Sequence, residues 1–335
     1  MIILDGSDAG GQYLRSALSL SVVTGQAFTL TNIRGKREKP GLQPQHLTCV
    51  EAMKHVCTAD VEGGVLHSTT LQFTPKSIHG GTYYFDIGTA GSTTLVLQTL
   101  LPALLFADQP SEITITGGTA NPLAPSAFDL EQIFFWHLQK MGIKINFELL
   151  QEGFAPKGGG KIRFKVSPVK RIQPIHLLER GKFLETNVFS FCSEDLQKRD
   201  VGKRLLDGFK QDFPRDRILQ EYSNVVHSLC TGCYLHAFAQ YEQTRLGWTV
   251  LGEQRKPAEM IGKECARHLL QIMNSTATID PFTTDQLVLY LALAKQGSFV
   301  IAEITEHLKT NIALIEKFLP VKFTIEKNVL SCTRL

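Results

Sequence analysis

A short basic segment near the amino terminus combines residue types that bind phosphate groups. Its sequence, RGKREKPG over residues 34–41, carries four cations within six residues and leads to Gln45 and His46. Arginine offers a planar fork of donors and lysine a compact positive charge, so a loop of this kind suits phosphate. Charge runs are also common on solvated surfaces, and the segment alone supports the two interpretations equally.

Two glycine-rich turns offer backbone groups to an anion. The segments DGSDAGGQ (residues 5–12) and GTAGSTT (residues 88–94) each precede a predicted helix, where free N–H groups and the helix dipole favour negative charge. Taken alone, a loop such as the first is more often a simple tight turn. Asp8 within it has the oxygen ligands that magnesium prefers, although a carboxylate here also suits a helix N-cap.

One histidine near the carboxyl terminus has the chemistry of a nucleophile toward phosphorus. His307 lies in ITEHLKTNI, residues 304–312, just ahead of a predicted helix over 310–318. A neutral imidazole can attack phosphorus, and the resulting P–N bond transfers its phosphoryl group readily. A lone histidine is more often an ordinary surface or core residue, so position in the sequence alone does not select it.

The elements that must position these residues follow a repeated order. Residues 1–57 read as strand, helix, strand and helix, with the basic segment before the second helix. The segments 70–74 and 81–85 then read as strands paired across a Gly80-Gly81 turn. A similar order follows over 88–166, where the turn at residues 156–160 is interpreted as a hairpin. Two units with a period of about eighty residues predict a layered α/β fold.

The residue pattern of the sequence changes between about residues 180 and 275. Charged helical stretches such as 194–213 precede alternating strands, after which residues 282–318 return to the earlier pattern. We therefore expect a smaller α/β domain over 182–276, inserted into a large domain formed by 1–181 and 277–335.

The composition is typical of a globular protein. Among 335 residues, 43% are hydrophobic and 20% charged, and the formal net charge is +3, which permits nucleic acid as a partner without indicating it. The first residues lack the pattern of a signal peptide, no run is long and apolar enough for a membrane span, and the seven cysteines do not resemble a disulfide framework. We expect a cytoplasmic protein without a membrane partner.

Seven segments together resemble the RNA 3′-terminal phosphate cyclase family, in the family's order and along nearly the whole chain. They are DGS…GGQ with LR, RGKREKPGLQPQHL, GTAGSTTLVLQTLLPAL, GGTANPLAPS, GFAPKGGG, TTDQLVLYLALA and EHLKTNIALIEKFLP. The ordered set is far more specific than any single member.

The resemblance implies an ATP-dependent ligase of RNA processing. A histidine, aligned with His307, attacks the α-phosphate of ATP and expels pyrophosphate. The AMP passes to an RNA 3′-phosphate, and the vicinal 2′-hydroxyl then displaces AMP to leave a 2′,3′-cyclic phosphate. The substrates are thus ATP and RNA with a 3′-phosphate end, and the resemblance leaves open whether the chain is a monomer or a homodimer.

The resemblance also assigns site residues by position. Phosphates of ATP or RNA would be contacted by Arg15, Arg34, Arg37, Gln45 and His46. The nucleotide would be contacted by Gln98, Asp285 and Gln286, and Asp285 is alternatively a residue that orients the histidine. Pro125 would lie on one adenine face and Phe282 on the other, where the family usually has Tyr.

The divalent metal, Mg or Mn, is assigned to Asp8. The family carries Glu in a longer loop, whereas here the loop is about two residues shorter and Asp8 is the nearest carboxylate. The implied fold has three repeats, each of two helices on a four-stranded sheet, with a smaller domain inserted before the last helix and histidine segment.

Two alternatives belong to other functional classes. Non-catalytic relatives bind RNA or ribosomal precursor particles and lack the histidine, so His307 and its basic loop favour the enzyme. A transferase of the enolpyruvyl shikimate phosphate synthase type has related repeats, but gives no reason for the EHLKTN or LQPQHL segments.

Overall fold

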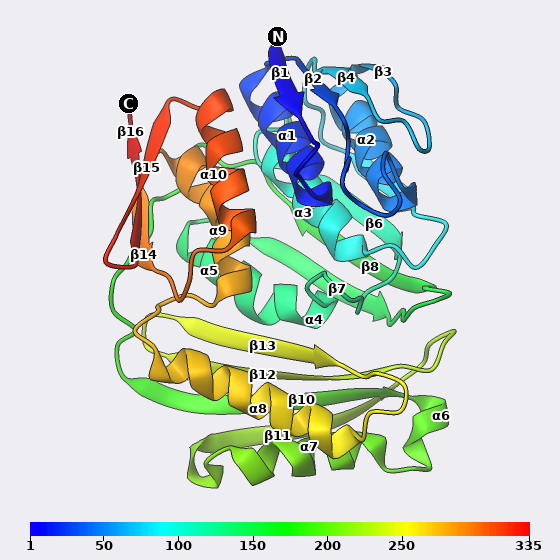
Figure 1. The fold of residues 1–335 in the computed structure, drawn as a ribbon, viewed down its shortest axis with the longest axis vertical. Coiled ribbons are helices and arrows are strands. Elements are labelled where there is room, and N and C mark those ends of the chain that lie inside the picture. Colours follow the sequence, from blue (N-terminus) through cyan, green and yellow to red (C-terminus); the bar gives the residue numbers. More distant parts are fainter.

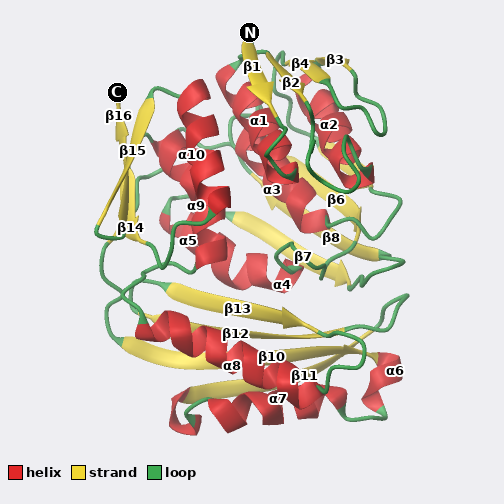
Figure 2. Cartoon of the chain, in the orientation of Figure 1, coloured by secondary structure: helices red, strands yellow, loops and turns green.

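The chain folds into four four-stranded sheets with helices packed against them, which confirms the mixed α/β class (Figure 1). The computed structural model describes residues 1–335. In the larger part of the molecule, which contains both chain ends, the helices pack against one another and the sheets lie outside them (Figure 2). None of the helices combines the length and apolar character that crossing a bilayer would require.

The first repeat has the strand order β1-β2-β4-β3, in which β1 and β2 are parallel and the other pairs antiparallel. Its elements are β1 (Ile2–Asp5), α1 (Gly11–Thr24), β2 (Phe28–Thr31), α2 (Pro44–Cys57), β3 (Asp60–Glu62) and β4 (Leu71–Thr74). Residues 16–22 of α1 are all buried, so this helix lies inside the core. Gly25 ends the helix in the left-handed conformation that glycine adopts without strain.

The second repeat has the equivalent order, β5-β6-β8-β7. Its elements are β5 (Thr82–Asp86), α3 (Thr93–Leu104), β6 (Ser111–Gly117), α4 (Ala127–Asp129), a π-helical turn (Leu130–Phe134), α5 (Phe135–Lys140), β7 (Ile145–Gln151) and β8 (Gly160–Val166). Because β5 begins 80 residues after β1 (82 − 2), the predicted period is confirmed, as is the hairpin between β7 and β8.

The third repeat is divided in the sequence but complete in space. Its elements are β9 (His176–Leu177), α9 (Pro281–Ala294), β14 (Gly297–Val300), α10 (Glu306–Phe318), β15 (Val321–Glu326) and β16 (Val329–Arg334). Their sheet order, β9-β14-β16-β15, repeats that of the other two, with β9 and β14 parallel. The three repeats that the resemblance implies are therefore confirmed.

The predicted pairing across Gly80-Gly81 is wrong. Strand β4 pairs with β2 and β3, whereas β5 pairs with β6 in a different sheet. A Cβ atom at Gly80 would overlap the carbonyl oxygen of Gln109, so the close approach of these two backbones accounts for this glycine. The two glycines lie in the connection between the first repeat and the second.

One hydrophobic core joins the three repeats. Its buried residues run from Leu4 to Leu177 and then from Ile279 to Cys332. Helix α1 packs against α2, α3 and α10, and α10 also packs against α9. The central helices therefore place the amino-terminal turn of the chain beside its carboxyl-terminal repeat.

A second core lies in the interrupting segment, with buried residues from Val188 to Met273. Its sheet has the order β11-β10-β12-β13, and α7 and α8 pack on one face (Figure 1). The elements are β10 (Phe183–Ser193), α6 (Glu194–Gln197), α7 (Val201–Asp212), a 3-10 turn (Arg215–Arg217), β11 (Ile218–Val226), β12 (Cys233–Tyr241), β13 (Arg245–Leu251) and α8 (Ala258–Asn274).

Arg180 holds together the two ends of this segment, where the chain enters it and where the chain leaves it. Its guanidinium donates to the carbonyl oxygens of Met273 at 2.7 Å and Ile272 at 2.8 Å, at the end of α8. The separate cores and this closure support our proposal that residues 182–276 are an inserted domain, with 1–181 and 277–335 forming the large domain.

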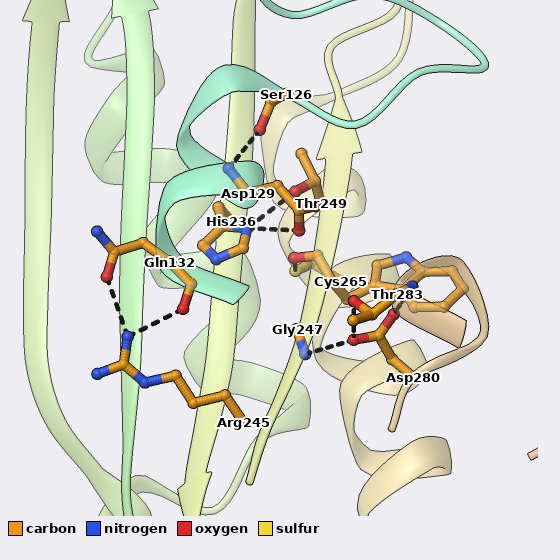
Figure 3. Close-up of polar contacts among 11 residues, drawn as sticks. Ser126, Asp129, Gln132, His236, Arg245, Gly247, Thr249, Cys265, Asp280 and Thr283 are labelled. Carbon is orange, nitrogen blue, oxygen red and sulfur yellow. Dashed lines mark hydrogen bonds and ion pairs between the residues drawn. The ribbon is translucent and has the colours of Figure 1, made fainter. Parts of the chain in front are cut away.

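Buried polar groups join the insert to the large repeats (Figure 3). The Nδ1 atom of His236 on β12 lies 2.9 Å from Thr249 Oγ1 and 3.6 Å from Asp129 Oδ1 of α4. The backbone N–H of Gly247 donates to Asp280 Oδ2 at 3.5 Å, and Asp280 also accepts from Thr283 N at 2.8 Å. Strand β13 thus contacts both α4 and the start of α9 through polar groups.

Two ionisable groups of this junction, Asp129 and His236, have pKa values shifted toward their neutral forms. Burial, with Asp280 nearby, raises the pKa of Asp129 to about 8. Burial and the charge of Arg245 lower the pKa of His236 to about 3. A neutral carboxyl and a neutral imidazole avoid placing charge in a site that water does not reach.

We predict that Asp129→Asn removes part of the pH dependence of stability between pH 6.5 and pH 8. Folded Asp129 keeps a proton that the unfolded carboxyl, with a pKa near 3.8, has released, so the free energy of unfolding falls as pH rises. His236, whose pKa is near 6.5 when unfolded, is present in both proteins, so its contribution cancels in the comparison. The parent should lose about 1 kcal/mol per pH unit more than the variant in urea unfolding. Parallel profiles would mean that folded Asp129 is ionised.

Candidate functional site

The amino terminus of α1 is left open to an anion. Its N-cap residue is Gly10, which has no side chain to accept from the first N–H groups, and the first turn contains no acidic residue. Uncapped N–H groups and the positive end of the helix dipole therefore face outward from the turn at residues 5–12. The turn therefore leaves these backbone donors available, and their use by an anion remains a prediction.

His307 lies beside this open helix end. A Cβ atom at Gly10 would stand 3.8 Å from His307 Cε1 and 3.2 Å from Arg37 Nη2. The histidine, Arg37, Asp8 and Tyr13 line one pocket of about 180 Å³, together with Ala9, Gly10, Gln12, Glu306, Thr310 and Asn311. The chain thus brings a nucleophile, a guanidinium and a free helix terminus together around one small space.

The sequence prediction placed His307 ahead of its helix, and this was wrong. Helix α10 begins at Glu306, so the histidine occupies its first turn. Thr305 is the N-cap, and its hydroxyl oxygen accepts from Leu308 N at 2.9 Å. The same hydroxyl donates to Asp285 Oδ1 at 3.0 Å. Asp285 therefore contacts the cap of the helix that carries His307, and burial raises the pKa of this carboxyl to about 6.

A second anion-binding corner is formed by His46 and Arg15. His46 Nδ1 accepts from the backbone N–H of Gln43 at 3.2 Å, so in the neutral ring the proton is on Nε2. That Nε2 atom and Arg15 Nη1 both approach Gly11, where a Cβ atom would overlap the imidazole. Burial and the charges of Arg15 and Arg34 lower the pKa of His46 to about 3, so the ring is a neutral donor.

The cations around this corner differ in what they contact. Arg15 forms no salt bridge, and burial lowers its pKa, as expected for a guanidinium without an acidic partner. Arg34 instead holds the basic segment, since its Nη1 donates to the carbonyl oxygens of Lys39 at 2.5 Å and Gly41 at 3.0 Å. Arg37 lines the His307 pocket. Arg15 and Arg37 are thus free to bind an anion.

The glutamines predicted at the site occupy two environments. The Oε1 atom of Gln45 accepts from Ser92 N at 2.8 Å, which ties α2 to the start of α3. Gln98 Nε2 and Gln286 Oε1 are buried without a hydrogen-bond partner. Buried polar atoms are nearly always paired, so these two amides are candidates to bind a ligand.

Pro125 and Phe282 lie nearer the insert. The carbonyl oxygen of Pro125 accepts from Thr94 Oγ1 of α3 at 2.9 Å, and the next residue, Ser126, is the N-cap of α4. Phe282 is in the first turn of α9, is 53% exposed, and packs against Trp248 of the insert. Neither residue lines the pocket of His307.

The model of the RNA 3′-terminal phosphate cyclase family matches residues 7–325. The matched range begins two residues into the amino-terminal turn and extends beyond α10, so it covers the other six segments in full. The chain belongs to the RNA 3′-terminal phosphate cyclase family.

A metal held by protein ligands alone does not fit this cyclase-family chain. No group of three His, Cys, Asp or Glu side chains is placed to hold an ion. The carboxylate of Asp8 lines the pocket but forms an exposed ion pair with Lys36. Two carboxylate side chains, those of Asp8 and Glu306, line the pocket, and so few protein ligands suit a magnesium ion that is held mainly by substrate phosphates and water.

Asn311 is a pocket residue that sequence reasoning missed. It lies one turn after His307 on α10, and its Nδ2 atom donates to the backbone oxygen of Asp285 at 3.3 Å. Its Oδ1 atom is buried without a partner. A helix predicted to begin at Glu306 would have placed His307 and Asn311 on one face, since residues four apart adjoin. Thr305 was missed because the helix was predicted to begin at residue 310, so residue 305 was not considered as its N-cap.

We predict that Thr305→Ala lowers the free energy of unfolding by about 1 kcal/mol, because it removes the cap of α10 and the hydrogen bond to Asp285. Thr305→Ser keeps the hydroxyl and should stay within about 0.5 kcal/mol of the parent. Urea unfolding measures both. Equal losses in the two variants would mean that the methyl group, and not the cap, stabilises this turn.

Proposed function

We propose that the chain converts an RNA 3′-terminal phosphate to a 2′,3′-cyclic phosphodiester at the expense of ATP. The observation that carries this proposal is the position of His307, in a pocket with Arg37 and against the uncapped terminus of α1. A nucleophilic imidazole surrounded by anion-binding groups suits attack on a phosphate. Family membership supports the same reaction class.

In the first step, a ring nitrogen of His307 attacks the α-phosphorus of ATP. A P–N bond forms, the P–O bond to pyrophosphate breaks, and pyrophosphate leaves. The N–H groups at the start of α1 and the guanidinium of Arg37 would stabilise negative charge that develops on the phosphoryl oxygens. The hydrogen bond from Thr305 to Asp285 would hold the histidine at the required place on α10.

In the second step, an oxygen of the RNA 3′-phosphate attacks the adenylated histidine and takes AMP, which frees the imidazole. The 2′-hydroxyl then attacks the 3′-phosphorus, forms the cyclic ester and releases AMP and a proton. Arg15 and His46 offer a second set of donors near Gly11, a suitable position for a phosphate of RNA or of ATP. Because His46 is neutral, it donates without adding charge.

The adenosine would lie on the insert side of the pocket. The ring of Phe282 offers an exposed aromatic face, and Pro125 offers an apolar one. The unpaired amide atoms of Gln98 and Gln286 are available to polar atoms of the nucleotide. Phe282 lacks the hydroxyl that the family's tyrosine supplies, so stacking without a hydrogen bond would hold the base.

A divalent cation, Mg or Mn, would enter with the triphosphate as part of the substrate. When bound, it would neutralise charge on the phosphates and polarise them. Asp8 is the residue that would supply a carboxylate oxygen from the short loop, in competition with its ion pair to Lys36.

We predict that incubation with α-labelled ATP and magnesium leaves acid-labile, base-stable label on the protein, because the label is held through a P–N bond to His307. His307→Ala should remove the label. His55→Ala, which changes an exposed histidine on α2, is the matched control and should label like the parent. Labelling of His307→Ala at the parent level would show that another residue is the nucleophile. An unlabelled parent that binds RNA would support a non-catalytic relative.

We also predict that Asp8→Ala raises the metal concentration needed for half-maximal labelling, since it removes the carboxylate nearest the triphosphate. Lys36→Ala should not raise this concentration, because it frees the same carboxylate from its ion pair. Titration of labelling with magnesium and with manganese measures both variants. An unchanged requirement in Asp8→Ala would remove this residue from the metal site.

A further inference from the structure

The insert supplies the surface against which Phe282 packs. The ring centroids of Phe282 and Trp248 are 4.8 Å apart at an interplanar angle of 47°. His268 of α8 stacks on Trp248 at 4.4 Å and 16°. Phe282 is nevertheless 53% exposed, so part of its ring remains open to a ligand. A phenylalanine has no polar atom that a hydrogen bond could hold, and Trp248 is the aromatic residue against which this ring packs.

The residues before and after Trp248 form hydrogen bonds toward the two segments that carry Phe282 and Pro125, between which the base is proposed to bind. Gly247 donates to Asp280, the N-cap of α9, two residues before Phe282. Thr249 hydrogen-bonds to His236, which lies 3.6 Å from Asp129 in α4, the helix that begins after Pro125 (Figure 3). A three-residue stretch of β13 therefore contacts the segment that carries Phe282 and, through His236, the segment that follows Pro125.

We propose that β13 of the insert fixes the base-binding slot between Pro125 and Phe282, with Trp248 as the residue that positions the Phe282 ring. This proposal rests on the function proposed above. It gives the inserted domain a role in the selection of the nucleotide, although His307 and the phosphate-binding groups all lie in the large repeats. Stacking without a base-edge hydrogen bond distinguishes bases mainly by ring area, so a correctly placed Phe282 favours a purine over a pyrimidine.

The test compares Trp248→Ala with Trp248→Phe in cyclisation of a 3′-phosphorylated oligoribonucleotide. Trp248→Ala should raise the KM for ATP by about three- to tenfold, the range expected for loss of an aromatic pair, and leave kcat within about twofold. It should also reduce the preference for ATP over CTP. Trp248→Phe keeps an aromatic surface and should restore both values.

Trp136 provides the matched control, because it is the only other tryptophan and packs against Lys140 and Arg245. Trp136→Phe should keep the parent KM. Parent values of KM and of ATP preference in Trp248→Ala would overturn the proposal. So would a fall in kcat and thermal stability that Trp248→Phe does not rescue, since that pattern belongs to a purely structural residue.

A second measurement separates this proposal from the cyclase proposal. In Trp136→Phe the single remaining tryptophan is Trp248, so its fluorescence reports on the ring stacked behind Phe282. Titration with AMP should change this fluorescence, and addition of Phe282→Ala should abolish the change, whether or not the protein cyclises RNA. An unchanged signal in a protein that is labelled by ATP would overturn the base-slot inference and leave the cyclase proposal intact.

Discussion

The parallel pairing of β9 with β14 is the contact on which the closure of the third repeat depends. His176 and Leu177 pair with Ser298 and Phe299 across the whole inserted segment. Thr278 supports the pairing, because its hydroxyl donates to the Leu177 carbonyl at 2.6 Å. This closure completes the third sheet and thereby holds α9 and α10 against the helices of the first repeat. The closure therefore adds to the direct packing of α10 on α1, which places His307 beside the amino-terminal turn.

With the third repeat closed, the geometry of the candidate site is set by the amino-terminal ends of three helices. The open terminus of α1, the capped terminus of α10 and the first turn of α2 meet around Gly10 and Gly11. Glycine is required here for space, since a side chain at Gly11 would occupy the position of His46. Helix dipoles, one neutral histidine and unpaired guanidinium groups then produce an environment that favours phosphate without a resident metal.

The insert is connected to this site by buried polar groups and by one aromatic contact. The neutral pair of Asp129 and His236 joins it to α4 without the cost of burying unpaired charge, and Trp248 joins it to α9. Such a junction keeps two separate cores in a fixed relation. The large repeats thus carry the residues proposed to bind phosphate, and the insert supports the part of the site that would hold the base.

The sequence by itself determined the local elements and the repeat. The predicted order of strand, helix, strand and helix over residues 1–57 is present, and so is the eighty-residue period, because hydrophobic spacing and glycine signals act over a few neighbouring residues. The ordered motifs also identified the family and selected His307 as the candidate nucleophile. What only the tertiary structure decided involves residues far apart in the chain. The pairing of β5 with β6, the approach of His307 to Gly10, the ion pair of Asp8 with Lys36 and the contact of Trp248 with Phe282 all depend on backbone closure and packing, which leave no local pattern in the sequence.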